Sequence, residues 1–166
     1  MEYFDIGLAL TEHQRQYFIQ YHEENKQDYY KHEVGEDYTN LDMLFFSLDP
    51  VLEEVFSMFA LRPTRASLMH VAPHAEIVPH VDGTEYQRLT AVVFPLAPTA
   101  QNFAPTSLYK DENASHYHSD CYAFNTQALH GVKNNEYDRL ALQLWYPQPF
   151  EDLKILHSIG KFIVSD

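Results

Sequence analysis

The sequence predicts a mostly β protein, an antiparallel barrel or sandwich that follows two α-helices. From residue 65 onward, short stretches of β-branched and alternating residues are separated by turn residues, with no helical pattern between them. Before residue 65, two stretches place apolar residues at helical spacing, each behind a helix-start signal. The chain has 166 residues, and this length predicts a single domain.

The first predicted helix covers residues 12–26. Thr11 stands three positions before Gln14, which is the spacing of a capping box. The aromatic residues that follow near helical spacing are Tyr17, Phe18 and Tyr21. An amphipathic helix therefore begins directly after Thr11.

The second predicted helix begins at Asp49-Pro50, where a capping side chain is followed by proline at the first helical position. It should end before Pro63, because proline cannot continue a helix. We expect residues 1–62 to form a helical layer on the outer face of a sheet. Within this layer, residues 27–40 are polar and aromatic without a clean period, and we expect a loop there.

The strands of the predicted β core lie within residues 63–150. They cover residues 66–71, 75–81, 89–96, 107–110, 116–125 and 139–146. The last strand is the most regular, and alternation divides its side chains between two faces. One face holds Arg139, Ala141, Gln143 and Trp145, which should line the interior. The other holds Leu140, Leu142, Leu144 and Tyr146, which should pack outward against the helices. For the tail at residues 151–166, helix and strand both stay open.

Composition limits the possible partners. The formal net charge of −13 repels nucleic acid and anionic membranes, unless a local basic cleft overrides it. No apolar run is long enough to cross a bilayer, and no signal peptide is evident. The single cysteine, Cys121, cannot form an intramolecular disulfide, which is typical of a cytoplasmic protein. We expect no nucleic-acid or membrane partner.

A candidate metal-binding pair lies in His80-Val81-Asp82. Residues two apart on a strand share a face, so the imidazole and the carboxylate would converge while Val81 points away. They are two thirds of a two-His-one-carboxylate triad, which binds non-heme Fe(II) from one side. The alternative is a surface histidine and a turn aspartate ahead of Gly83.

The candidate third ligand is His130, fifty positions after His80 on a strand that would return beside the first two ligands. The alternative is a buried histidine bonded to a backbone carbonyl. The chain has 10 histidines, so any one of them alone is more often structural than a ligand. We leave the following in the structural class: His22, His32, His70, His74, His116, His118 and His157.

Two arginines are candidates for binding carboxylates. Arg139 lies on the interior face of its strand, and a buried guanidinium needs an anionic partner. That partner is either a ligand carboxylate, held bidentately, or one of the 24 acidic residues. Arg88 would share a strand face with Thr90 and could bind a second carboxylate of co-substrate or substrate. Alternatively, Arg88 is an edge-strand residue in solvent.

The order His80-x-Asp82, Arg88, His130 and Arg139 resembles the Fe(II)/2-oxoglutarate-dependent oxygenases. More narrowly, it is similar to their aspartyl/asparaginyl β-hydroxylase-like branch. The resemblance covers residues 65–150 and implies a double-stranded β-helix, a jelly-roll or cupin-like barrel. It also implies that His80, Asp82 and His130 bind Fe(II).

The resemblance further implies the co-substrates and the reaction. Arg139 would hold the distal carboxylate of 2-oxoglutarate, and Ser67 is the nearest candidate for an assisting hydroxyl. The branch often has Arg-x-His after the His-x-Asp pair, whereas this chain has Arg88-Leu89-Thr90. Thr90 is therefore a candidate for binding the co-substrate, and whether it replaces the contact of that histidine stays open. O2 would be consumed, succinate and carbon dioxide released, and a peptide side chain or a small molecule hydroxylated. The alternatives are a non-catalytic cupin-like barrel that binds metal or ligand, and an interaction module whose histidines belong to the core.

Overall fold

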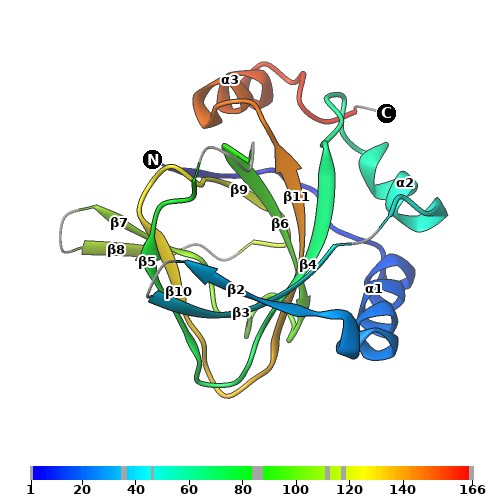
Figure 1. The fold of residues 1–166 in the computed structure, drawn as a ribbon. Coiled ribbons are helices and arrows are strands. Elements are labelled where there is room, and N and C mark those ends of the chain that lie inside the picture. The colour runs from blue at the N-terminus through cyan, green and yellow to red at the C-terminus, as the bar shows by residue number, and fades with distance from the viewer. Residues whose placement is uncertain are drawn as a thin grey trace.

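The computed structural model describes residues 2–34, 37–45, 47–83, 88–110, 113–116 and 119–164 (Figure 1). The helices are α1 (Glu12–Glu24), α2 (Pro50–Phe56) and α3 (Phe150–Ser158), with a 3₁₀ turn at Lys26–Asp28. The strands are β1 (Tyr3–Asp5), β2 (Tyr30–Val34), β3 (Asp37–Phe45), β4 (Arg65–Val71), β5 (Glu76–His80), β6 (Thr90–Ala97), β7 (Ser107–Lys110), β8 (Asn113–His116), β9 (Tyr122–Asn125), β10 (His130–Lys133) and β11 (Arg139–Tyr146).

The strands form a seven-stranded sheet, β1-β9-β6-β11-β4-β3-β2, and a four-stranded sheet, β5-β10-β7-β8. All the strand pairs that the structure describes are antiparallel. From β4 to β11 the chain passes repeatedly between the two sheets, and each sheet receives four of these eight strands. This exchange between two facing sheets is the arrangement of a jelly roll. The predicted mostly β, antiparallel class is confirmed.

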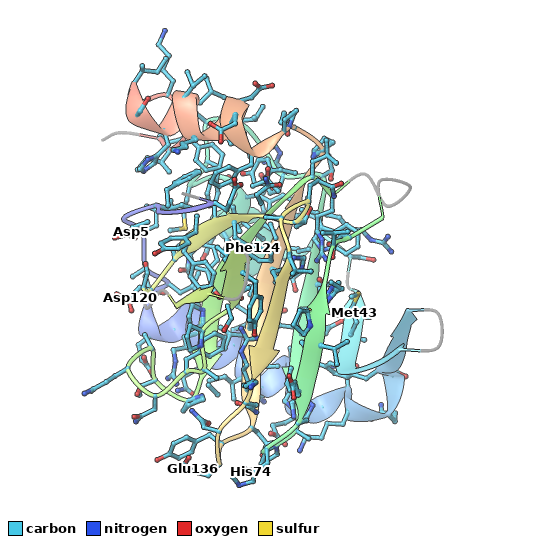
Figure 2. All side chains as sticks on the ribbon, turned by 90° about the vertical axis from the view of Figure 1, so that its left-hand side faces the viewer. Asp5, Met43, His74, Asp120, Phe124 and Glu136 are labelled. Carbon is cyan, nitrogen blue, oxygen red and sulfur yellow. The ribbon has the colours of Figure 1, made fainter. Side chains whose placement is uncertain are left out.

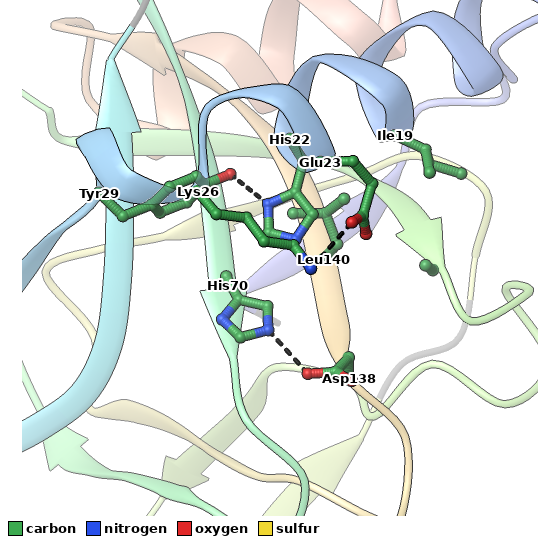
Figure 3. A pocket seen from close by; sticks show the side chains of 9 residues that line it. Ile19, His22, Glu23, Lys26, Tyr29, His70, Asp138 and Leu140 are labelled. Carbon is green, nitrogen blue, oxygen red and sulfur yellow. Dashed lines mark hydrogen bonds and ion pairs between the residues drawn. The ribbon is translucent and has the colours of Figure 1, made fainter.

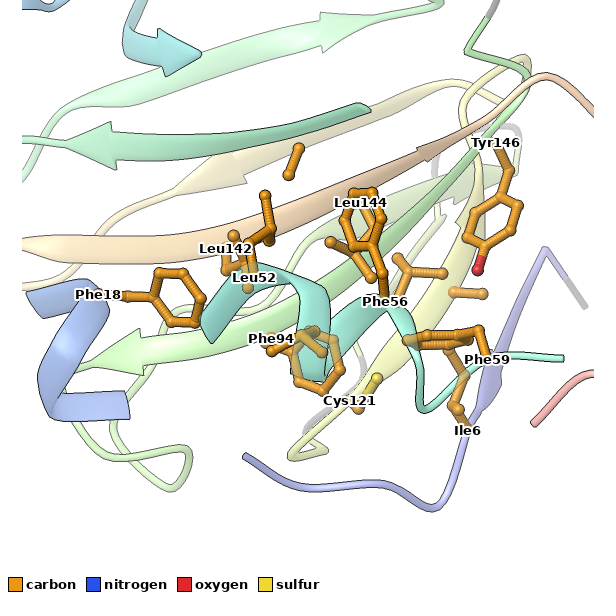
Figure 4. Packing of buried hydrophobic residues seen from close by; sticks show 14 of the residues in the cluster. Ile6, Phe18, Leu52, Phe56, Phe59, Phe94, Cys121, Leu142, Leu144 and Tyr146 are labelled. Carbon is orange, nitrogen blue, oxygen red and sulfur yellow. The ribbon is translucent and has the colours of Figure 1, made fainter. Parts of the chain in front are cut away.

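Strand β11 lies at the centre of the larger sheet and is buried along its whole length. Leu140, Leu142 and Leu144 join a buried apolar cluster that also contains Phe18 of α1 and Leu52 of α2 (Figure 4). The alternate residue Ala141 belongs to a separate buried cluster with side chains of β6 and β9. The alternation predicted for residues 139–146 is therefore confirmed, and it gives β11 one apolar face and one face toward the interior of the barrel.

Both predicted helix starts are confirmed. Thr11 and Gln14 form a reciprocal capping box at α1. Asp49 accepts a hydrogen bond from the backbone N–H of Leu52 at 2.7 Å, with Pro50 at the first position of α2. Helix α2 ends at Phe56, earlier than the predicted limit at Pro63.

The prediction of a loop over residues 27–40 is wrong. After the 3₁₀ turn, β2 and β3 form a hairpin, and β3 pairs with β4 from Leu41 opposite Val71 to Phe45 opposite Ser67. Residues 35–36, between these strands, lie outside the described part. The pairing with β4 is long-range, and the local sequence pattern gives no signal for it.

The C-terminal tail begins as α3, and Ile163 then forms an isolated β-bridge with Phe59. In the described ranges, no helix is both long enough and apolar enough to span a bilayer.

Candidate metal centre

The three predicted metal ligands converge at one end of the smaller sheet. His80 is the last residue of β5, His130 is the first residue of β10, and the two are direct cross-strand partners. Figure 2 views the molecule from this side, with β5 and β10 adjacent. Asp82 lies just beyond β5, where its backbone N–H donates to the carbonyl of Thr126 at 3.0 Å. The strand ends two residues before Asp82, yet the Asp82 side chain still meets both imidazoles.

The ligand atoms have the spacing that a metal ion needs. Asp82 Oδ1 lies 3.4 Å from His80 Nε2 and 3.3 Å from His130 Nε2. Two ligands, each about 2.1 Å from one divalent ion and at right angles, stand about 3 Å apart. Among the residues that the structure describes, this is the only group of three His, Cys, Asp or Glu side chains whose ligand atoms lie within 4.8 Å of one another. The site therefore fits a two-His-one-carboxylate metal.

Backbone carbonyls orient both imidazoles. His80 Nδ1 donates to the carbonyl of Val78 at 2.7 Å, and His130 Nδ1 donates to the carbonyl of Ala128 at 2.8 Å. With Nδ1 protonated, each Nε2 keeps its lone pair for a metal. The alternative considered for His130, a hydrogen bond to a backbone carbonyl, is thus present and is compatible with metal binding.

Asp82 is held as a carboxylate. Burial alone would raise its pKa, but the Arg88 guanidinium, and after it the two histidines, hold the pKa of Asp82 well below its usual range. For His80, burial would lower the pKa, but the hydrogen bonds with Asp82 and with the Val78 carbonyl raise it overall. A deprotonated carboxylate facing the Nε2 atoms of two imidazoles is the donor set that a divalent cation requires, and a cation that binds there replaces any proton on Nε2.

Arg88 lies in the interior, and its partner there is Asp82. Its Nε donates to Asp82 Oδ2 at 3.1 Å, its Nη2 donates to the same oxygen, and its Nη1 donates to Gln143 Oε1 at 2.9 Å. The guanidinium also lies over the Trp145 ring, 4.7 Å from the centroid. The alternative of a solvent-exposed edge arginine is wrong, and the carboxylate that Arg88 contacts belongs to the protein itself.

Arg139 is a buried cation. It is 1% exposed, its Nε donates to the carbonyl of Ala104 at 2.7 Å, and its Nη2 lies 3.4 Å from Thr106 Oγ1. Its guanidinium carbon is 4.2 Å from the centre of the Phe103 ring. Burial lowers the pKa of Arg139, while a hydrogen bond with Tyr122 acts in the opposite direction. Within the described chain, no acidic side chain forms an ion pair with Arg139, so the salt-bridge alternative finds no partner there.

A single pocket is lined by both histidine ligands and both arginines. Its lining includes His80, His130, Arg88, Arg139 and Gln143. Phe124 of β9 also faces it, with its ring centroid 4.9 Å from that of His130 (Figure 2). Arg139 and Gln143, from the predicted interior face of residues 139–146, thus line the same pocket as the two histidines.

Ser67 and Thr90 lie elsewhere. Ser67, on β4, accepts a hydrogen bond from the Trp145 indole N–H at 3.0 Å. Thr90, the first residue of β6, donates to the carbonyl of Gln148 at 2.9 Å. The prediction that Arg88 and Thr90 share a strand face is wrong, because β6 begins only at Thr90 and alternation does not extend back to Arg88.

Sequence reasoning missed the neutral residues around Arg139. Phe103 and Ala104 lie between strands, in a segment that the sequence marked only as a turn region. Thr106 and Tyr122 are bonded to each other, with 2.8 Å between their hydroxyl oxygens. Contacts of this kind depend on how separate strands meet, so no local spacing could have indicated them.

A second pocket lies between α1 and the strands β4 and β11 (Figure 3). His22 Nδ1 is 2.7 Å from the Tyr29 hydroxyl, and His70 Nε2 is 2.9 Å from Asp138. The two imidazoles stack with their centroids 5.2 Å apart. Both histidines therefore have partners within the protein, in agreement with their structural assignment.

Comparisons with known proteins establish the fold. No protein-family model and no curated protein match this sequence. A prolyl-4-hydroxylase from Pseudomonas putida has a TM-score of 0.62 and 11% identity over 87% of this chain and 91% of its own. A prolyl hydroxylase from Trichoplax adhaerens, solved with a fragment of hypoxia inducible factor, has a TM-score of 0.63 and 14% identity, with coverages of 87% and 81%.

A third similar structure is SnoN, an epimerase from nogalamycin biosynthesis. In complex with Fe3+, alpha-ketoglutarate and nogalamycin RO, it has a TM-score of 0.60 and 10% identity over 86% of this chain and 77% of its own. At such low identity the similarity shows the fold alone. The chain therefore has the same fold as these three enzymes, with the jelly-roll arrangement described above.

Proposed function

We propose that the chain is an Fe(II)- and 2-oxoglutarate-dependent oxygenase. One observation carries the proposal: the two histidines of a His-Asp-His triad line the same pocket as Arg139, a buried cation without an acidic partner among the described residues. A metal-storing cupin-like barrel would use the triad but would have no need for this arginine. A desolvated guanidinium costs several kcal/mol unless an anion compensates it.

His80, Asp82 and His130 would hold the iron. Bound ferrous iron would supply the redox chemistry that couples O2 to oxidation of a C–H bond. The protein would fix the ligands through the carbonyls of Val78 and Ala128.

Arg139 would bind the distal carboxylate of 2-oxoglutarate. Its Nε is committed to the Ala104 carbonyl, and the long 3.4 Å contact of Nη2 with Thr106 leaves donor capacity for an anion. The Thr106 and Tyr122 hydroxyls lie beside it; one of them donates to the other, and the remaining O–H could donate to the same carboxylate. Ser67 and Thr90 are outside this proposal, because neither lines the pocket that contains Arg139.

The proposed reaction is hydroxylation of a peptide side chain or a small molecule, with release of succinate and carbon dioxide. The comparison structures include one solved with a peptide and one solved with a small natural product, so they support either substrate class equally. The assignment to the aspartyl/asparaginyl β-hydroxylase-like branch stays a prediction.

The test is to measure succinate formation and anaerobic 2-oxoglutarate binding by the purified chain with Fe(II). Wild type should give a visible charge-transfer band with Fe(II) and 2-oxoglutarate and should form succinate. His130→Ala should lose both, and Arg139→Met should bind metal but lose 2-oxoglutarate affinity. His74→Ala, a substitution at an exposed position, is the control and should match wild type. A protein that binds metal but forms neither band nor succinate would instead be a non-catalytic cupin-like barrel.

A further inference from the structure

Arg88 divides the two oxygens of the Asp82 carboxylate between two roles. Oδ2 accepts from Nε and Nη2 of Arg88, whereas Oδ1 faces the Nε2 atoms of His80 and His130 at 3.4 and 3.3 Å. The pair is largely buried, with side-chain exposures of 12% for Arg88 and 9% for Asp82. Only one oxygen of this carboxylate is therefore directed at the metal site.

Arg88 is itself anchored to the opposite sheet. Its Nη1 donates to Gln143 on β11, and its guanidinium plane lies over Trp145 on the same strand. Trp145 is fixed in turn by the hydrogen bond from its indole N–H to Ser67 on β4. Asp82 follows β5 of the smaller sheet, so Arg88 connects the metal ligand to the two central strands of the larger sheet.

We propose that Arg88 is a positioning residue of the metal centre, which holds Asp82 as a one-oxygen ligand, and that it does not bind the carboxylate of a co-substrate or substrate. This inference rests on the proposed function of the site. A carboxylate with both oxygens free can bind a divalent cation through one or both of them. With Oδ2 occupied by two N–H donors, only Oδ1 is available, and the positions that a two-His-one-carboxylate site offers to co-substrate and O2 stay open.

The two arginines of the pocket therefore differ in role. The charge of Arg88 is compensated by Asp82, and each of its three nitrogens donates to Asp82 or Gln143. Arg139 has only neutral partners in the described part of the chain. An incoming carboxylate would gain most at Arg139, because no carboxylate of the described residues pairs with its guanidinium.

The test is a calorimetric titration of the full chain with Mn(II) alone, followed by titration of the Mn(II)-saturated protein with 2-oxoglutarate. Arg88→Gln should weaken Mn(II) binding about 10- to 100-fold, the range typical of lost outer-shell partners of metal ligands. Arg88→Lys should be intermediate, because an ammonium keeps the charge but not the forked geometry. At saturating Mn(II), 2-oxoglutarate affinity should match wild type. The matched control is Arg65→Gln, since Arg65 lies over the same Trp145 ring, 5.5 Å from its centroid, and should leave both affinities unchanged.

Unchanged Mn(II) affinity combined with weakened 2-oxoglutarate binding in Arg88→Gln would overturn the inference and make Arg88 a co-substrate ligand. If wild type itself binds no Mn(II), the proposed function fails, and the inference about Arg88 fails with it. The two failures are distinguishable, because the first shows in the wild-type titration and the second only in the Arg88→Gln titration. If Arg88→Gln does not fold, Gln143→Leu removes one anchor of Arg88 without touching Asp82. It should weaken Mn(II) binding several-fold, and wild-type affinity in both Gln143→Leu and Arg88→Lys would again overturn the inference.

Discussion

Gly131 is the position where a single methyl group should damage both the fold and the metal site. It follows His130 on β10, beside residues 77–79 of β5. A Cβ at this position would lie 2.6 Å from the carbonyl oxygen of Ile77 and 3.2 Å from the backbone nitrogen of Pro79. Both obstacles are backbone atoms, so they cannot turn aside as a flexible side chain could. Gly131→Ala must therefore push the two strands apart.

The size of the effect follows from these distances. To bring the closest pair to ordinary contact at 3.4 Å, the strands must separate by about 0.8 Å. Overpacking of this kind costs about 1–3 kcal/mol of stability. The displacement also exceeds the roughly 0.5 Å within which metal ligands must be held. If about 1.4 kcal/mol of the strain falls on the geometry of His130 and His80, Mn(II) affinity drops about tenfold.

Urea unfolding and Mn(II) titration measure the two effects separately. Gly160→Ala is the control, because a Cβ there meets nothing within 4 Å, while its φ of +71° imposes a backbone cost of about 1–2 kcal/mol. The control should lose stability but keep the Mn(II) affinity of wild type. If Gly131→Ala keeps both its stability and its metal affinity, β10 and β5 do not pack closely enough at Gly131 to exclude a methyl group.

Three further predictions address the caps, the second pocket and the metal. Asp49→Ala removes the cap on the Leu52 N–H and should cost about 1 kcal/mol in urea unfolding; no loss would mean that the cap is not formed in solution. Burial and then His70 lower the pKa of His22, so its neutral form stabilises the fold above about pH 6.5, and this contribution is lost as the pH falls. When the pH falls from about 7.5 to 5.5, the unfolding free energy of His22→Gln should therefore decrease less than that of wild type. The control His13→Gln, at an exposed position, should follow wild type. The same pH dependence in all three proteins would contradict the prediction. Finally, Mn(II) at about 100 times its Kd should raise the unfolding free energy of wild type by about 2.7 kcal/mol, and EDTA should reverse the gain; a stability that does not respond to Mn(II) would exclude the metal centre.

The features that could be predicted from sequence are those that local chemistry decides. The capping box at Thr11 and the Asp49-Pro50 start each depend on residues within one turn. The bounds of β11 were predicted because alternation persists over its whole length and both of its faces are buried. The pairing of His80 with Asp82 was predicted from the two-residue period of a strand; β5 ends at His80, but the two side chains still converge.

The features that could not be predicted depend on pairing between distant segments. The β2–β3 hairpin is attached to the sheet by the pairing of β3 with β4, and its polar sequence does not predict this pairing. The partnership of Arg88 with Asp82 depends on a chain reversal between β5 and β6, and strand alternation does not continue through such a turn. Arg139 has no acidic partner in the part of the chain that the structure describes. Its surroundings depend on how all the strands of the barrel assemble. From the sequence alone, the partner of Arg139 could be a ligand carboxylate or an acidic residue of the chain. Only the assembled pocket separates these two alternatives.

The register of β11 links the stability of the fold to the chemistry of the site. One face of this strand places Leu142 and its neighbours in the apolar cluster, and the other provides Arg139 and the Gln143 anchor of Arg88. A slip of one residue would exchange the two faces along the whole strand. Leucines would then fill the pocket, and Arg139 would be buried in the apolar cluster at a cost of several kcal/mol. The register that buries the leucines is therefore the same register that directs a cation toward the candidate metal centre, so selection for a stable core also preserves the site.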